Sequence, residues 1–288
     1  MWRATGAFRC NGMLSFAEFQ EVEALTGRSR ADAYSTPRWL KLAEHLLPPL
    51  VSMGMNVLKE AFPQDPDLGT VPICAMHHLV DCLVESMNAN REGRHAVAVS
   101  LLRQCIEAMT LVDVGLQDQG LVAEVLRQWK DGRLTNGDVR AFLEQEVWPR
   151  YGCGLWDEPW TEFFSNLSRA VQPYAHYSPQ LQGWQLAYLS APKATGDGYI
   201  GTVLIGPQTC DPLKASRITL LFGLFCWVIG RLLLAFGRNP DVNSLRDKIS
   251  ELGNALGSSK LLLKRKDWAL ELLPDMWFKG VSDWIDEP

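Results

Sequence analysis

The stretch from Leu167 to Pro179 holds the side chains of this chain that are best suited to chemistry. Arg169 and His176 stand seven residues apart, with Ser168 and Tyr177 beside them. Seven residues is close to two helical turns, so both side chains share one face if a helix runs through the stretch. Histidine moves protons near neutral pH, and arginine holds a phosphate and its developing charge. The pair suits metal-independent cleavage of RNA.

Pro173 supports a second interpretation of the same stretch. Proline removes a backbone donor and clashes with the preceding turn, so it kinks or ends a helix. Arg169 and His176 then come together only if the kink allows it, and His176 is at least as well explained as a structural histidine. The same Arg-to-His spacing recurs at Arg38 and His45.

A second polar pair, Arg103 and Glu107, lies in the apolar text SLLRQCIEAMTL. Residues four apart share a helical face and form ion pairs. Charges among apolar neighbours need partners, since breaking a buried pair costs about 3–5 kcal/mol. We favour an internal structural ion pair that reaches another helix. The alternative is the polar wall of a pocket.

Metal binding has one signal, His77-His78 followed by Asp81. Adjacent helical residues point about 100° apart, so the two histidines do not readily share a metal, and one His–Asp pair is two ligands short of most sites. The chain also lacks the P-loop, G-x-G-x-x-G, H-E-x-x-H and G-x-S-x-G motifs. We predict no metal site and no cofactor.

Helical periodicity dominates the elements that must position these residues. The strongest signature covers residues 95–116, where apolar side chains recur at i, i+3, i+4 and i+7. Two breaks are expected, one at Pro48-Pro49 and one over the loop 63–70. Helices are predicted near residues 16–25, 37–47, 50–62, 72–90, 95–116, 120–131, 137–148, 158–172, 212–237 and 241–256.

Residues 184–206 break the helical pattern. The segments WQLAYLSA and YIGTVLIGP are rich in β-formers and flank the turn-rich PKATGDG, which predicts a β-hairpin. The predicted fold class is mainly α: a bundle of about eight to ten helices with this inserted hairpin. We expect a single domain over residues 1–288 with a helical tail over 241–288. The basic run KLLLKRK at 260–266 is typical of a solvated face, or of a contact with nucleic acid or an acidic partner.

One apolar segment, Ile218–Phe236, is long enough to span a membrane. Arg231 interrupts it, and a charge at the centre of a bilayer costs about 2.5–3.5 kcal/mol on insertion scales. We favour a central helix buried in the bundle, with Arg231 paired to a carboxylate, over a membrane span. No membrane partner is therefore predicted.

Composition indicates a globular protein of the cytoplasm. The 288 residues are 47% hydrophobic and 21% charged, which suffices for a large core, and the net charge of −5 favours neither nucleic acid nor an anionic membrane. The seven cysteines include no C-x-x-C, which fits a reducing compartment. Cys74, Cys82, Cys105 and Cys226 lie in apolar helical text, as small hydrophobes do. The first residues contain no apolar core of signal-peptide length.

The sequence resembles the HEPN superfamily of helical nucleotide-binding proteins, many of them toxin or phage-defence ribonucleases. Their hallmark is Arg, four to six residues of any kind, then His, and Arg169–AVQPYA–His176 has this spacing. SLLRQCIEA and LSRAVQPYAHYS also resemble bacterial helical proteins with an Arg-x-x-x-Glu helix followed by a Leu-Ser…His segment. The resemblance covers roughly residues 75–180. It implies a metal-independent endoribonuclease of a defence or toxin–antitoxin system, with His176 as acid/base, Arg169 as phosphate clamp and a site formed across a homodimer.

A competing prediction is a non-catalytic helical binding or regulatory protein. In that protein Arg103, Glu107 and His176 organise the core or a ligand pocket, or polar residues form a protein–protein interface. Ser168 and Tyr177 are further candidates for the polar lining of such a pocket. Predicted partners are thus RNA, a second copy of the chain or another protein.

Overall fold

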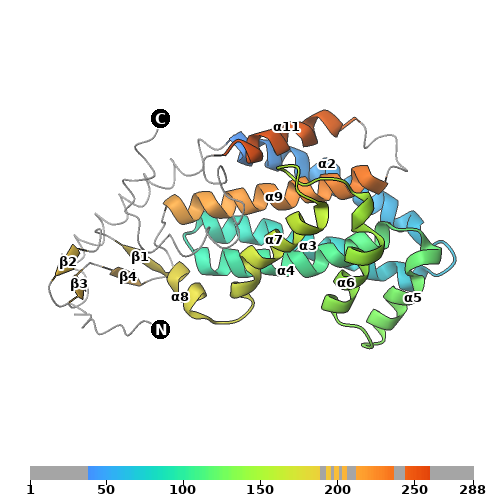
Figure 1. The fold of residues 1–288 in the computed structure, drawn as a ribbon, viewed down its shortest axis with the longest axis horizontal. Coiled ribbons are helices and arrows are strands. Elements are labelled where there is room, and N and C mark those ends of the chain that lie inside the picture. Colours follow the sequence, from blue (N-terminus) through green and yellow to red (C-terminus); the bar gives the residue numbers. More distant parts are fainter. Residues whose placement is uncertain are drawn as a thin grey trace.

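The computed structural model describes residues 38–188, 193–195, 198–200, 203–205, 212–236 and 244–259. Within them the chain is mainly helical and forms nine α-helices (Figure 1), which confirms the predicted helical bundle. The predicted helix near 16–25 and the basic run 260–266 lie outside the described residues. The predicted tail over 241–288 is described only as far as residue 259.

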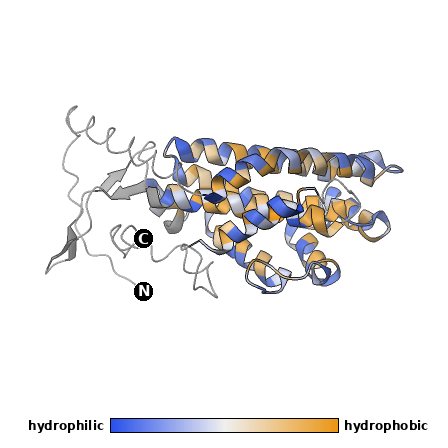
Figure 2. Cartoon of the chain, turned by 90° about the horizontal axis from the view of Figure 1, so that it is seen from above, coloured by the Kyte–Doolittle hydropathy of each residue, from blue (hydrophilic) through white to orange (hydrophobic). Residues whose placement is uncertain are grey.

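Helix α9 (Pro212–Phe236) runs through the middle of the bundle (Figure 1). It packs against α2 (Arg38–Ala61), α3 (Pro66–Arg91), α4 (His95–Leu116) and α11 (Arg246–Gly257). Its almost continuous apolar sequence is what a helix surrounded by others requires, because no face is left for polar residues. In Figure 2, hydrophobic and hydrophilic residues alternate along the outer helices instead, as in amphipathic elements.

Among the described residues, α9 is the one helix long and apolar enough to cross a membrane. Inside the bundle, 83% of its most apolar window is buried. A central core helix and a membrane span have the same length and composition. The absence of a membrane partner and the cytoplasmic location therefore stay predictions.

Arg231 on α9 does not form the predicted ion pair with a carboxylate of the described residues. Its Nη2 donates to the carbonyl oxygen of Tyr151 at 3.1 Å. The guanidinium lies over the rings of Trp160 and Trp227, with its Cζ 5.4 and 5.1 Å from their centroids. Partial burial lowers the pKa of Arg231. Two indole faces and a carbonyl replace the expected carboxylate, because cation–π contact also stabilises a partly desolvated guanidinium.

The break predicted at Pro48-Pro49 is wrong, because α2 continues through both prolines. A proline inside a helix costs about 3 kcal/mol or more. The apolar stripe of α2 is buried on both sides of the prolines, as at Leu46, Leu50 and Leu58. Burying each such side chain contributes about 1.5–3 kcal/mol, so packing against α9 and α11 outweighs the local cost.

Helix α3 begins six residues before the predicted start. Asp65 caps it by accepting a hydrogen bond from the Leu68 amide at 3.0 Å, and Pro66 occupies the first turn, where a missing N–H costs nothing. Pro72, which we expected to open the helix, lies inside it. There its ring contacts α4, at a point where Gly115 gives α4 no side chain: a Cβ built on Gly115 would come within 2.2 Å of the Pro72 Cβ.

The remaining elements cover the α3–α4 pair and carry the candidate site. They are α5 (Gln119–Lys130), α6 (Asn136–Glu146), the 3₁₀ turn η1 (Trp148–Arg150), α7 (Trp160–Val171), the 3₁₀ turn η2 (Gln172–Tyr174) and α8 (Pro179–Gln185). Buried apolar residues of all these layers form one continuous core with α9.

Four strands of three residues each lie in the region of the predicted hairpin. Strand β1 (Leu186–Tyr188) pairs antiparallel with β4 (Val203–Ile205), and β2 (Lys193–Thr195) pairs antiparallel with β3 (Gly198–Ile200). The segments that would join them lie outside the described residues. The hairpin over 184–206 therefore stays a prediction.

Candidate functional site: a polar seam between α4, α6 and α7

Helix α6 connects the polar residues of two other helices. Its start is fixed by a capping box, in which Thr135 and Asp138 exchange hydrogen bonds between side chain and backbone. This places Asn136 in the first turn, where its Nδ2 donates to Glu107 Oε2 at 2.9 Å and its Oδ1 accepts from Trp129 Nε1 at 2.7 Å. One turn later Arg140 Nη1 donates to Ser168 Oγ on α7 at 2.9 Å.

We call this group the polar seam; it comprises Arg103, Glu107, Asn136, Arg140 and Ser168. The first two come from α4, the next two from α6 and the last from α7. Four of the five side chains thus meet through side-chain hydrogen bonds to a neighbouring helix. Sequence analysis singled out the α4 and α7 members and missed both residues of α6.

Arg103 has the most unusual environment in the seam. Its Nη2 lies 2.9 Å from Glu107 Oε1, so the ion pair expected from the spacing forms. The side chain of Arg103 is 11% exposed, whereas that of Glu107 is 40% exposed. Both Nε and Nη1 of Arg103 are buried and have no hydrogen-bond partner among the described residues. A buried donor without an acceptor costs about 1–3 kcal/mol, more when charged, so the fold holds this guanidinium incompletely satisfied.

Arg169 and His176 do not lie on one continuous helix. Helix α7 ends at Val171, and η2, which contains Pro173, follows it. Both side chains are exposed. Arg169 Nη2 donates to Asn166 Oδ1 within α7, and no hydrogen bond joins Arg169 to His176. The shared face expected from a seven-residue spacing is therefore lost, because the 3₁₀ turn changes the direction of the chain.

Tyr177 forms no hydrogen bond with the seam residues. Its side chain is largely exposed, and its hydroxyl donates to Gln185 Oε1 at 3.4 Å. The next residue, Ser178, accepts from the Leu181 amide at 3.1 Å and donates to the Pro173 carbonyl at 2.8 Å. Of the residues predicted from this stretch, Ser168 alone belongs to the seam.

The second arginine–histidine match has a clear structural explanation. Arg38 and His45 both lie on α2, so here the spacing does put them on one face. Arg38 pairs with Glu251 at 2.7 Å, and His45 Nδ1 lies 2.6 Å from the Lys41 carbonyl oxygen. The pair is a surface ion pair and a local hydrogen bond, and it serves below as a control for Arg169 and His176.

A buried carboxyl group that the sequence analysis did not single out lies at the end of α4. Asp113 Oδ2 accepts from Trp148 Nε1 at 2.6 Å, and Oδ1 accepts from the Tyr151 hydroxyl at 2.5 Å and from Gln117 Nε2 at 3.0 Å. Burial raises the pKa of Asp113 to about 6, against the lowering effect of these donors. The sequence signal was an acid inside a strongly apolar helical segment. Its partners fasten η1 and the following loop to α4, which is a structural task.

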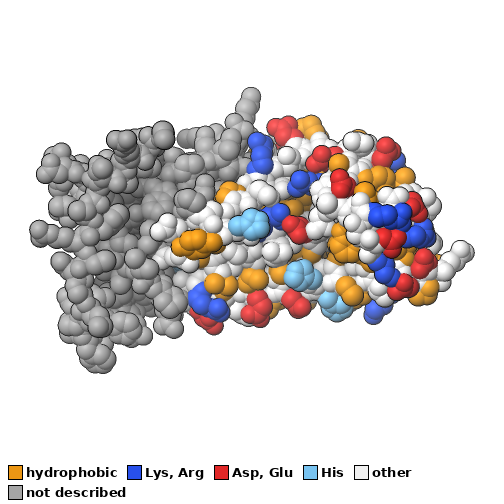
Figure 3. All heavy atoms as spheres, turned by 90° about the horizontal axis from the view of Figure 1, so that it is seen from below, with side chains coloured by type: hydrophobic (Ala, Val, Ile, Leu, Met, Phe, Trp, Pro, Cys, Tyr) orange, Lys and Arg blue, Asp and Glu red, His pale blue; other side chains and the backbone are white. Residues whose placement is uncertain are grey.

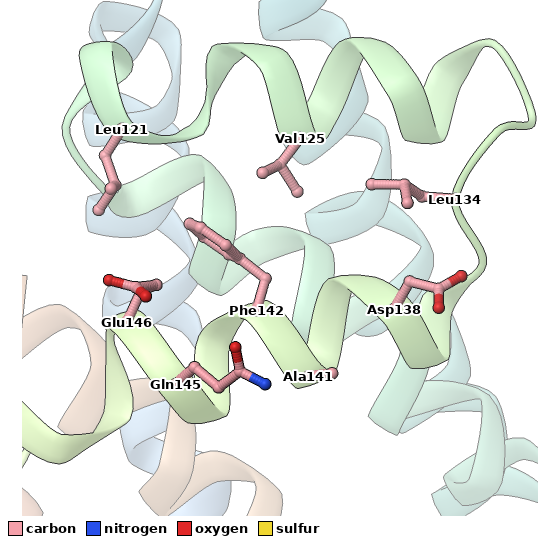
Figure 4. A pocket seen from close by; sticks show the side chains of 8 residues that line it. All are labelled: Leu121, Val125, Leu134, Asp138, Ala141, Phe142, Gln145 and Glu146. Atoms are coloured by element: carbon pink, nitrogen blue, oxygen red, sulfur yellow. The ribbon is translucent and has the colours of Figure 1, made fainter.

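An apolar groove lies between α5 and α6, apart from the seam (Figure 4). Its volume is about 430 Å³, and the lining includes Leu121 and Val125 of α5 and Phe142 of α6, with Asp138 and Glu146 toward opposite ends of α6. None of the residues predicted for a site lines it. The described residues also contain no group of three or more His, Cys, Asp or Glu side chains that could hold a metal ion.

Surface charge on the described part of the lower face is mixed. Figure 3 shows acidic and basic side chains interspersed there, without one broad basic area. Exposed ion pairs such as Arg127–Glu124 at 2.8 Å account for some of this pattern. Binding of a long nucleic acid uses a stripe of unpaired cations instead.

No protein-family model, no curated protein and no solved structure matches this chain. The resemblance to HEPN proteins therefore stays a prediction.

Proposed function

We propose that this protein is a helical binding protein whose polar seam takes the oxyanion group of a small ligand, a phosphate or a carboxylate. The main support is Arg103, whose Nε and Nη1 are buried and meet no acceptor in the part of the chain that the structure describes, while Nη2 is held by Glu107. A phosphate or carboxylate carries several acceptor oxygens and forms charge-assisted hydrogen bonds with guanidinium N–H groups. Binding would therefore remove the cost of two unsatisfied donors.

The rest of the seam fits this role. Glu107 is the more exposed member of the Arg103–Glu107 pair, so a ligand would approach from the Glu107 side. A small movement of the Glu107 side chain would then uncover Arg103. Glu107 is itself oriented by Asn136, which limits how far it moves. Arg140, about one-third exposed, supplies a second cation on the neighbouring helix. The mixed charge on the described part of the face shown in Figure 3 offers no broad basic area for a long polyanion.

Thermal unfolding with added anion tests this proposal. The probes are inorganic phosphate and acetate, each titrated against the wild-type chain and Arg103→Met, which keeps the volume and removes the charge. A ligand at 100 times its Kd adds about 2.7 kcal/mol to the unfolding free energy. We expect a saturable rise in Tm with at least one probe for the wild type and none for Arg103→Met. The proposal fails if no probe gives a saturable rise, or if Arg103→Met responds like the wild type.

Arg127→Met is the matched control for this experiment. Arg127 is 48% exposed and pairs with Glu124 on the surface of α5. Its removal changes the net charge as Arg103→Met does but leaves the seam intact. The control should respond to the probes like the wild type. An equal loss of response in both variants would show that the anions respond to the net charge of the protein. That result would contradict binding at the seam.

RNA cleavage is the second candidate function. The observation that favours it is that Arg169 and His176 are both exposed, so a polymer could reach them, and that Arg169 follows Ser168 of the seam in the chain. In this mechanism His176 transfers the proton and Arg169 clamps the phosphate, without a metal. The resemblance to HEPN ribonucleases adds a homodimer that completes the site.

Cleavage of a labelled single-stranded RNA in the presence of EDTA tests the second candidate. We expect wild-type cleavage, loss of activity in His176→Ala and full activity in His45→Ala. His45 is a matched control because it follows Arg38 by seven residues, as His176 follows Arg169. Its ring is engaged in a local hydrogen bond with the Lys41 carbonyl oxygen. An inactive wild type that light scattering shows to be a dimer, or an active His176→Ala, would rule out this mechanism.

A further inference from the structure

Helices α5 and α6 form a hairpin that carries apolar residues on two sides. The side that faces α4 is fully buried; its residues are Val122, Leu126, Val139 and Leu143. The outward side carries a second apolar row, which is only partly buried; its residues are Leu121, Val125, Leu134 and Phe142. A surface helix of a bundle normally has one apolar stripe toward the core and polar residues opposite. Outward apolar surface with a polar rim is instead typical of interaction sites.

The outward side is hollowed into the α5–α6 groove, which has a carboxylate toward either end (Figure 4). Asp138 and Glu146 are eight residues apart on α6, which is about 12 Å along the helix axis. Ala141 and Phe142 lie between them, and Figure 4 shows Phe142 pointing toward α5. No lysine or arginine of the described residues lines the groove. The lining is therefore apolar in the middle and acidic toward both ends.

The two carboxylates are not neutralised by cations of the described chain. Neither Asp138 nor Glu146 forms an ion pair there. Asp138 Oδ2 accepts from the Thr135 amide and hydroxyl, both at 2.7 Å, which uses one of its two carboxylate oxygens. Arg127 of α5 pairs with Glu124 at 2.8 Å instead. The complementary surface is one with apolar side chains in the middle and a positive charge at each end.

We propose that the α5–α6 groove docks an amphipathic helix of a partner protein, with apolar side chains in the middle of its contact face and a lysine or arginine at each end. Positions 138, 141, 142, 145 and 146 of α6 follow the i, i+3, i+4, i+7, i+8 pattern of one helical face. A partner helix that lies along this row meets it with the same spacing, so its two cations are seven or eight residues apart. Recognition of a helix in an apolar groove uses such regularly spaced anchors. The proposal is independent of the polar seam and of RNA cleavage.

The chain's own basic run, KLLLKRK at 260–266, does not have this spacing. No lysine or arginine stands seven or eight positions after any cation of the run: those positions hold Asp, Trp, Glu, Leu and Pro. The run also follows directly on α11, which packs against α9 and α2. Figure 1 shows α11 and α6 on opposite sides of α9. We therefore assign the groove to a separate protein.

Binding of a designed peptide to the full-length chain tests the proposal by fluorescence polarisation. The probe is a labelled peptide of alanine and glutamine with two lysines eight positions apart, and with leucines three, four and seven positions after the first lysine. We expect saturable binding that weakens as sodium chloride rises from about 50 to about 500 mM, because salt screens exposed charges. A peptide with glutamate in place of both lysines should bind at least about tenfold more weakly. The proposal fails if the probe shows no saturable binding, or if the two peptides bind equally.

A peptide of residues 259–273 of this chain is the competing occupant in the same assay. It should bind more weakly than the probe, because its cations lack the required spacing. Tighter binding of this peptide would identify a second copy of the chain as the occupant and would overturn the assignment to a separate protein.

Substitutions on α6 locate the bound probe. Glu146→Gln removes the carboxylate toward one end of the groove and should weaken binding about two- to fivefold, as loss of an exposed ion pair does. Glu144→Gln is the matched control: it removes the same charge two residues earlier, outside the groove lining, and should bind like the wild type. Ala141→Arg places a bulky cation in the groove and should abolish binding, with little change in Tm because the position is exposed. Equal affinities of the two glutamate variants, or wild-type affinity in Ala141→Arg, would show that the probe binds elsewhere and would refute the proposal.

Discussion

Replacing Asp113 by asparagine should remove one part of the pH dependence of the protein's stability. The carboxyl group is buried at the end of α4, with Trp148, Tyr151 and Gln117 as donors. Burial is the larger influence and raises its pKa from the ordinary 3.8 to about 6. Asparagine has the same shape, keeps an oxygen acceptor for Trp148 and carries no charge at any pH.

The size and sign of the effect follow from linkage between protonation and folding. Between pH 3.8 and about 6 the folded state holds a proton on Asp113 that the unfolded state has lost. The stability contributed by this group is therefore full below pH 3.8 and is lost as pH rises through about 6. At about 1.4 kcal/mol for each pH unit, the loss amounts to about 3 kcal/mol between pH 3.5 and pH 7.

Urea unfolding from pH 3.5 to 7.5 measures this difference. The unfolding free energy of the wild type minus that of Asp113→Asn should fall by about 3 kcal/mol as pH rises through this range. Asp138→Asn is the control, because hydrogen bonds from Thr135 lower the pKa of that exposed carboxyl group. The unfolding free energy of the wild type minus that of Asp138→Asn should instead rise with pH. The reason is that the stability contributed by the Asp138 carboxylate is lost as pH falls. Parallel curves for the wild type and Asp113→Asn would refute the claim that burial dominates at Asp113.

Three further substitutions test the same packing. Trp148→Phe removes a donor to Asp113, so the pKa of this acid should rise above 6 and unfolding at pH 7 should become about 1.5–3 kcal/mol easier, with a smaller effect at pH 4. Gly115→Ala puts a Cβ within 2.2 Å of the Pro72 Cβ and should cost about 1–3 kcal/mol, measured as a lower urea midpoint; a neutral result would mean that α3 and α4 separate easily. Gly137→Ala, whose nearest neighbour is the Thr135 hydroxyl at 3.5 Å, should instead stabilise α6 by up to about 0.5–1 kcal/mol.

Elements stabilised by their own apolar pattern could be predicted from the sequence. The bounds of α4 match the predicted 95–116, because nearly every face of this helix is buried and the pattern ends where burial ends. Proline rules failed where burial outweighed them, as at Pro48 and Pro49 inside α2. The proline rule concerns the hydrogen bond and sterics of one helical turn. It does not include the apolar surface that the neighbouring turns bury, which can stabilise the helix by more than the proline costs.

Contacts within one helix were predictable for the site, and contacts between helices were not. Arg103 and Glu107 pair because they are four residues apart on α4. Asn136, 29 positions after Glu107, meets it only because α6 folds back along α4. Nothing in the sequence around Asn136 indicates that contact, because the local pattern predicts only the start of a helix. The Arg169–His176 prediction failed as a shared helical face for a related reason, because a 3₁₀ turn replaces the continued helix that the spacing assumed.

Arg103 and Arg231 show why burial alone does not identify a site. Both interrupt apolar helical text, and the same argument predicted a carboxylate partner for each. Arg231 is held by a carbonyl oxygen and two indole faces, so its surroundings leave no demand for another group. Arg103 has its carboxylate but keeps two buried donor nitrogens without acceptors among the described residues. A fold selected only for stability gains from replacing such an arginine with an apolar residue of similar volume. The unmet hydrogen-bonding capacity, and not the charge, is therefore what makes Arg103 the residue on which a ligand would act.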